Sequence, residues 1–101
     1  MSKKSKVVWS PSAIHHFSSW VHYIAKDSLK AAEKERSLIL KAAARLESFP
    51  LSGRVVPELG NPNLREVICS SIRLIYEIQD KAVRILAFHH AKRRLDLMLF
   101  G

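Results

Sequence analysis

Hydrophobic and polar residues follow two different periods along this chain, and the change of period separates a helical part from a strand part. Residues 6–9 (KVVW) are β-branched and aromatic, which predicts a short first strand. Ser10 can cap a helix and Pro11 fits its first turn, so we expect a helix to begin there. The helix is supported by a stripe of apolar residues at helical spacing: Ile14, Phe17, Val21 and Ile24.

A second helix is predicted after a short polar break. Residues 26–28 (KDS) end the first helix and offer caps for the next. The second helix is expected to run to about Ser48, because Phe49 precedes Pro50 and a residue before proline is disfavoured in α geometry. Two helices joined by so short a break predict a helical hairpin. Residues 51–63, with two glycines and two prolines, are predicted to form a loop.

The stretch from Leu64 to Arg94 has a different pattern. Three runs rich in Val, Ile, Leu and Tyr are interrupted by Ser70-Ser71 and by residues 79–81 (QDK), which predicts a three-stranded antiparallel meander. The sequence therefore predicts one α+β domain over residues 1–101, with an N-terminal strand, a helical hairpin and then the meander. Residues 1–5 are expected to be a disordered leader, and the apolar tail after Arg94 is expected to pack on the domain.

Composition narrows the choice of partners and of compartment. The net charge of +8 predicts an acidic protein or a nucleic acid as partner, with a membrane surface as the weaker alternative. A single cysteine excludes an internal disulfide and fits a reducing compartment. No apolar run approaches the roughly 18 residues of a membrane span, and the first residues do not form a signal peptide. We therefore expect a cytoplasmic protein without membrane contact. The histidines and the cysteine lack the spacing of a metal site, so no metal and no other cofactor is expected.

Much of the positive charge falls on the predicted meander, which suggests a face that meets a polyanion or an acidic protein. The cations there are Arg65, Arg73, Arg84, His89, His90, Arg93 and Arg94. Arg65 and Arg73 could instead pair with Glu66 or Glu77 across the sheet. Adjacent strand residues point to opposite faces, so at most one of the two histidines can share a face with Arg73. The sequence leaves open which one does.

Three runs of sequence carry a family resemblance. FPLSGRVVPELGNPNLRE, IRLIYEI and VRILAFHHAKR occur in the order and spacing seen in the RelE/ParE superfamily of bacterial toxins, and the similarity extends from residue 7 to about Arg94. The resemblance implies helices packed on one face of an antiparallel sheet, with the opposite face used for the target. It also implies a type II toxin–antitoxin pair, in which an acidic antitoxin folds as it wraps the toxin.

One branch of the superfamily cuts messenger RNA in the ribosome, and the resemblance implies roles for residues of this chain. Glu58 would be the base, Arg73 the phosphate clamp, and His90 or its neighbour His89 the proton donor. Arg54 and Arg65 would add positive field around the phosphate. Several RNA-cutting members carry a tyrosine or another acid–base residue near the C-terminal end. The ending AKRRLDLMLF has no tyrosine and departs from that pattern.

The ParE branch instead grips DNA gyrase and traps it on broken DNA, which requires a complementary surface and no catalytic set. The ending FHHAKRRLDLM and the run GRVVPELGNPNLRE are similar to this branch, which we favour over the RNA-cutting reading. The residues expected to contact the target or a nucleic acid are Arg54, Arg65, Arg73, His89, His90, Lys92, Arg93 and Arg94.

Overall fold

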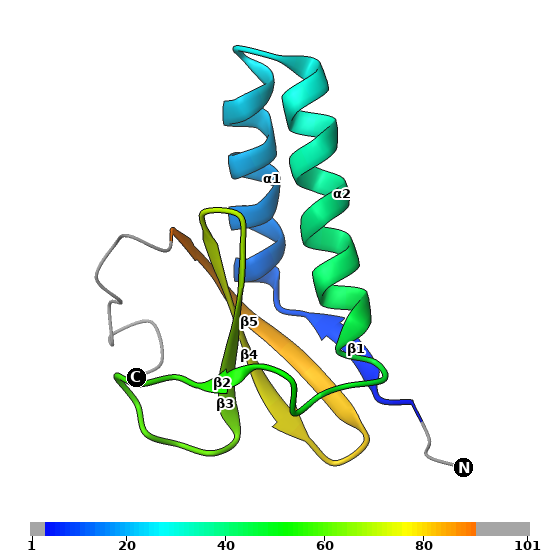
Figure 1. The fold of residues 1–101 in the computed structure, drawn as a ribbon, viewed down its shortest axis with the longest axis vertical. Coiled ribbons are helices and arrows are strands. Elements are labelled where there is room, and N and C mark those ends of the chain that lie inside the picture. The colour runs from blue at the N-terminus through cyan, green and yellow to red at the C-terminus, as the bar shows by residue number, and fades with distance from the viewer. Residues whose placement is uncertain (1–3, 91–101) are drawn as a thin grey trace.

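The computed structural model describes residues 4–90, which form two helices and one five-stranded sheet. In chain order the elements are β1 (Lys6–Trp9), α1 (Pro11–Ala25), α2 (Leu29–Arg45), β2 (Arg54–Val55), β3 (Leu64–Cys69), β4 (Ile72–Gln79) and β5 (Ala82–His90). The strands lie in the order β1-β5-β4-β3-β2 (Figure 1). β1 runs parallel to β5, and the other neighbours are antiparallel. The predicted α+β class and order of elements are confirmed.

Both helices begin where the sequence predicted. The Ser10 hydroxyl accepts a hydrogen bond from the Ala13 N–H at 3.1 Å, and the Ser28 hydroxyl accepts one from the Ala31 N–H at 3.0 Å. These contacts satisfy backbone donors that would otherwise lack a partner at the helix starts. The predicted end of the second helix near Ser48 is wrong, since α2 ends at Arg45. Residues 46–48 donate to carbonyls three positions back, so the chain tightens into a turn there.

The meander forms as predicted, with its turns at the polar breaks. Ser70-Ser71 joins β3 to β4, and Asp80-Lys81 joins β4 to β5. Ser70 and Lys81 have φ of 59° and 60°, the left-handed conformation that such tight turns use. Two pairings were not predicted. The two-residue strand β2 lies inside the expected loop and pairs with β3, and β1 pairs with the distant β5.

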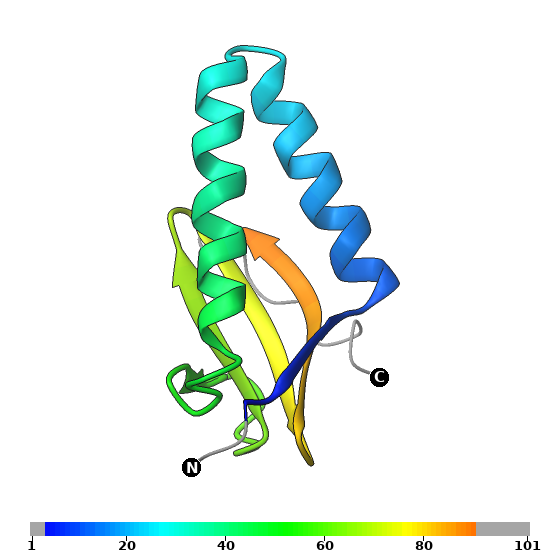
Figure 2. The same cartoon turned by 90° about the vertical axis from the view of Figure 1, so that its right-hand side faces the viewer.

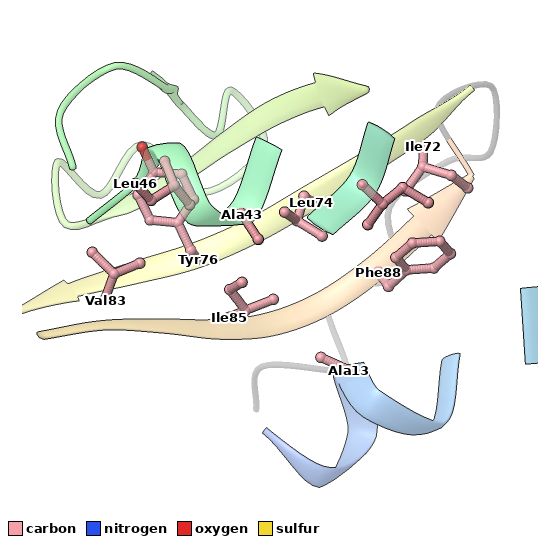
Figure 3. Packing of buried hydrophobic residues seen from close by; sticks show 10 residues of the cluster. Ala13, Ala43, Leu46, Ile72, Leu74, Tyr76, Val83, Ile85 and Phe88 are labelled. Atoms are coloured by element: carbon pink, nitrogen blue, oxygen red, sulfur yellow. The ribbon is translucent and has the colours of Figure 1, made fainter. Parts of the chain in front are cut away.

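The core lies between the helices and one face of the sheet. α1 and α2 lie on the same side of the sheet, and the tip of their hairpin rises beyond its end (Figures 1 and 2). Alternate residues of β4 and β5 point toward the helices, where Leu74 and Tyr76 are fully buried. Trp9 and Trp20 pack against this cluster. The remaining buried members are Ala13, Ile39, Ala43, Leu46, Ile72, Val83, Ile85 and Phe88, most of which Figure 3 shows.

Candidate functional site

The side of the sheet that faces away from the helices, called the open face here, carries a cluster of four charged residues. Because Leu74 and Tyr76 point toward the helices, their neighbour Arg73 points to the open face. The register places Glu66 diagonally across from Arg73, and it pairs Arg54 of β2 with Glu66 of β3. Three adjacent strands therefore bring these residues together.

Arg73 lies at the centre of the cluster, between two carboxylates. Its Nε donates to Glu66 Oε2 at 2.7 Å, and its Nη2 donates to Glu66 Oε1 at 2.8 Å. The other edge of the guanidinium donates from Nη1 and Nη2 to the two oxygens of Glu58, at 2.8 and 2.9 Å. Arg54 Nε lies 3.4 Å from Glu66 Oε1. Two arginines and two glutamates thus balance each other in one network.

Burial divides the network into an inner and an outer pair. The side chain of Glu66 is 0% exposed and that of Arg73 is 7% exposed, while Glu58 is 34% and Arg54 is 62% exposed. A buried charge is stable only with a hydrogen-bonded counter-ion. Arg73 and Glu66 therefore depend on each other, and the outer residues complete the neutralisation.

The network favours the charged forms of Glu58 and Arg73. Hydrogen bonds from the Arg73 guanidinium lower the pKa of Glu58 from its ordinary value of 4.5 to about 2. The same contacts, with those of Glu66, raise the pKa of Arg73 further above its usual range. A general base works best when its pKa lies near the operating pH. Glu58 is therefore poorly suited to take a proton at neutral pH, which weighs against the catalytic role expected for it.

A turn of the connecting loop covers the middle of the open face and carries Glu58. Val56 is fully buried there against Ile75 and Ala87, and Leu59 packs beside them. The Val56 N–H donates to the Leu64 carbonyl, and Gly60, with φ of 62°, donates back to the Val56 carbonyl. A second, smaller apolar cluster therefore fixes the loop on the sheet and delivers Glu58 to Arg73.

Arg65 does not join the cluster, because it neighbours Glu66 on β3 and points to the other side of the sheet. Its Nε donates to the Pro62 carbonyl at 3.0 Å, and its Nη1 donates to the Gly53 carbonyl at 3.0 Å and to that of Leu51 at 3.4 Å. The structure thus shows Arg65 tying down the loop on either side of β2. The alternative pairing of Arg73 with Glu66 is the one that the structure contains.

The two histidines take different positions in the register. His89 pairs with Arg73 across β4 and β5, whereas His90 pairs with Ile72. His89 therefore shares the open face with Arg73, which answers the question that the sequence left open. The side chain of His90 and the predicted contact residues Lys92, Arg93 and Arg94 lie outside the described residues.

Glu66 is the member of the cluster to which the sequence assigned no functional role. A two-residue turn at Ser70-Ser71 pairs Ile68 with Arg73, and this register alone makes Glu66 a diagonal neighbour of Arg73 on the same face. The contact could therefore have been found by counting back from the turn. Arg84 is likewise matched in register by Glu77. On the described part of the open face, each of the three arginines (Arg54, Arg73 and Arg84) therefore lies beside a glutamate.

The helical hairpin packed on one face of the sheet is the arrangement that the resemblance to the RelE/ParE superfamily implied. A family model described as ParE toxin of type II toxin-antitoxin system, parDE, matches residues 7–95. The chain belongs to this family, and it is a ParE-like toxin of a type II system. That membership implies a cognate antitoxin as partner.

One solved structure supports the same fold. It is described as a chromosomal ParDE TA system from P. aeruginosa, and the two chains superpose with a TM-score of 0.73 at 17% sequence identity. The match covers 90% of this chain and 100% of the other. No curated protein matches the sequence. Within residues 4–90, the structure contains no helix long and apolar enough to cross a membrane.

Proposed function

We propose that this toxin arrests growth by binding DNA gyrase, without cutting RNA itself. Gyrase inhibition is the action that the resemblance implies for the ParE branch, to which the chain belongs. The choice of gyrase binding over RNA cleavage rests on one observation: Glu58 and Arg73 form an ion pair with each other. Glu66 and Glu58 occupy the two edges of the Arg73 guanidinium. A phosphate could reach Arg73 only by displacing Glu58, so the candidate clamp and the candidate base would not act side by side.

The cell experiment separates gyrase binding from RNA cleavage. The chain is induced alone in a bacterial host, and double-strand breaks, the DNA-damage response and transcript ends are followed over time. Gyrase trapping predicts breaks before any fall in translation, whereas RNA cleavage predicts cut transcripts at once. Growth arrest with cut transcripts and intact DNA would contradict the proposal. No arrest at good expression would contradict the toxin assignment itself.

A single substitution tests the catalytic alternative within the same assay. Glu58→Gln removes the candidate base while keeping the size of the side chain, so RNA cutting should fall by about 100-fold or more if Glu58 were that base. If the toxin acts by binding gyrase, toxicity should change by less than about threefold, because one such change in a large interface should alter the binding free energy by less than about 1 kcal/mol. Glu77→Gln is the matched control, because it removes the same charge from a strand position of the open face outside the cluster.

The segment from His89 to Arg94 is the part of the expected contact set that we propose contributes most to gyrase binding. Replacing Lys92, Arg93 and Arg94 with Ala should abolish gyrase trapping, because steering by charge depends on where the charges lie. The matched control removes three exposed cations from α2, by the changes Lys30→Ala, Lys34→Ala and Arg36→Ala. Equal loss of trapping in both variants would show that only net charge matters.

The antitoxin partner is proposed to be acidic and to fold on the toxin. The toxin's charge of +8 supports this, because complementary charge speeds the encounter. Mixing the two proteins should raise the helix or strand content seen by circular dichroism above the sum of the separate spectra. An antitoxin that is fully folded on its own, or that associates equally fast at high salt, would contradict this part.

A further inference from the structure

We propose that Arg73 and Arg54, above the buried Glu66, form an anion-binding site that Glu58 fills in the free chain, and that this site takes a carboxylate of a protein partner in place of Glu58. The site exists whether or not gyrase is the target, since it follows from the described residues alone. Glu58 would then occupy the site in the absence of the partner, and the strength of its contacts would set how readily the partner's carboxylate binds.

The balance of charge is the first argument. With Glu58 in place the cluster holds two guanidinium groups and two carboxylates, and every carboxylate has an arginine partner. Without Glu58, two cations face one carboxylate, and the outer N–H groups of Arg73, whose side chain is 7% exposed, lose their acceptors. Charged donors so poorly hydrated require a new acceptor. The site therefore favours an anion at the position that Glu58 now occupies.

The second argument is that Glu58 is the carboxylate that can leave the cluster. Arg54, Glu66 and Arg73 lie on strands that pair with their neighbours, whereas Glu58 lies in the loop between β2 and β3. A third of its side chain is exposed. Glu58 can turn into solvent by rotation about its own side-chain bonds, while the backbone hydrogen bonds of Val56 hold the loop in place.

The third argument concerns the shape of the ligand. The two oxygens of Glu58 accept from Nη1 and Nη2 of Arg73 at 2.8 and 2.9 Å, the fork-to-fork arrangement of a carboxylate on a guanidinium. A flat group with two oxygens fits beside the buried Glu66 and reproduces these contacts. An Asp, a Glu or a C-terminal carboxylate of a partner offers this group. The bulkier tetrahedral phosphate of a nucleic acid is the competing ligand that the experiment distinguishes.

The experiment uses the full chain carrying Glu58→Gln, which removes the negative charge from the anion position but keeps a side chain of the same size. Acetate and inorganic phosphate are titrated separately against chloride at equal ionic strength, and the Nε resonance of Arg73 is followed by NMR. We expect a saturable shift with acetate and an affinity about tenfold or more above that of the unaltered chain, because the intramolecular competitor has gone. Glu77→Gln, the matched control, should respond like the unaltered chain.

Three results would overturn the proposal. If folded Glu58→Gln shows no saturable response to acetate, or one no larger than that of Glu77→Gln, Glu58 is only a structural brace. If phosphate binds and acetate does not, the site belongs to a nucleic acid. Should Glu58→Gln fail to fold, Glu58→Asp keeps the charge but shortens the side chain, so its acetate affinity should lie above that of the unaltered chain. Equal affinities would then overturn the proposal.

Discussion

The two faces of the same strands are stabilised in opposite ways. Toward the helices, Leu74 and Tyr76 are fully buried in a cluster of apolar side chains. One residue away along β4, Arg73 is almost as deeply buried but lies among carboxylates. Apolar packing adds up from many small contacts and tolerates replacements of similar size. A buried charge network fails when one member is lost, because the remaining members are left unmatched.

The largest expected effect is at the centre of the open face. Arg73→Ala should lower the free energy of unfolding by about 3–5 kcal/mol, because it leaves Glu66 buried without its counter-ion. Urea denaturation at neutral pH measures the change. Arg84→Ala, on the same face but exposed, is the control and should stay within about 0.5 kcal/mol. A loss below about 1 kcal/mol for Arg73→Ala would mean that the face relaxes around the vacancy.

The helix side should respond differently to truncation and to exchange. Leu74→Ala should cost about 2–5 kcal/mol by leaving a cavity in the core. Leu74→Met should cost less than about 1.5 kcal/mol, since the volume is kept. Arg73→Lys keeps the charge at the neighbouring position but cannot make the two-sided contact. If the lysine is tolerated as well as the methionine, the contrast between the two faces is wrong.

Gly53 lies where the loop before β2 comes closest to the sheet, so a substitution there tests this close approach. A Cβ at this position would lie 2.5 Å from Tyr76 Oη and 2.6 Å from the Glu66 carbonyl oxygen. Gly53→Ala should therefore cost about 1–3 kcal/mol by forcing the loop away from the sheet. The Gly53 N–H also donates to Tyr76 Oη, which donates to the Pro50 carbonyl. Tyr76→Phe is the comparison, because it removes these hydrogen bonds without adding an atom. Thermal denaturation of the two variants shows which one loses more stability.

The smallest effect is the pH dependence that Glu58 gives to the open face. Its pKa is lowered to about 2 in the folded chain from an ordinary value of 4.5. Its contribution to stability is therefore complete above about pH 4.5 and is lost as pH falls toward 2. Allowing for its exposure, we expect about 1–2 kcal/mol. Unfolding curves at pH 6, 4.5 and 2.5 should show less change for Glu58→Gln than for the unaltered chain, and parallel curves would contradict this.

The sequence predicted what depends on local chemistry. Two helix caps and two turns were predicted from residue types that favour them. The structure contains all four, with caps at Ser10 and Ser28 and turns at Ser70-Ser71 and Asp80-Lys81. The pairing of β1 with β5 was not predicted, because a four-residue strand carries no mark of a partner more than 70 residues away.

Three of the four residues of the charged cluster were named from the sequence, but their mutual pairing was not. Arg54, Glu58 and Arg73 were named from the motifs, and the structure places all three in one cluster. Their mutual neutralisation was not foreseen, because it depends on how far each side chain is buried. Counting from the turn could have brought Glu66 beside Arg73. No count along the chain could have shown that the loop turn from Val56 to Leu59 closes over the same face.

The parallel pairing of β1 with β5 has a consequence for synthesis on the ribosome. β1 is made before its partners, residues 82–85, which follow it by more than 70 residues. The Ser10 amide, at the start of α1, likewise waits for the Ile85 carbonyl. The helical hairpin can form early from local contacts, but β1 has no strand to pair with until β5 has left the exit tunnel. A nascent copy therefore has no complete open face until β5 has emerged. An antitoxin made in that interval can be present when the face is completed.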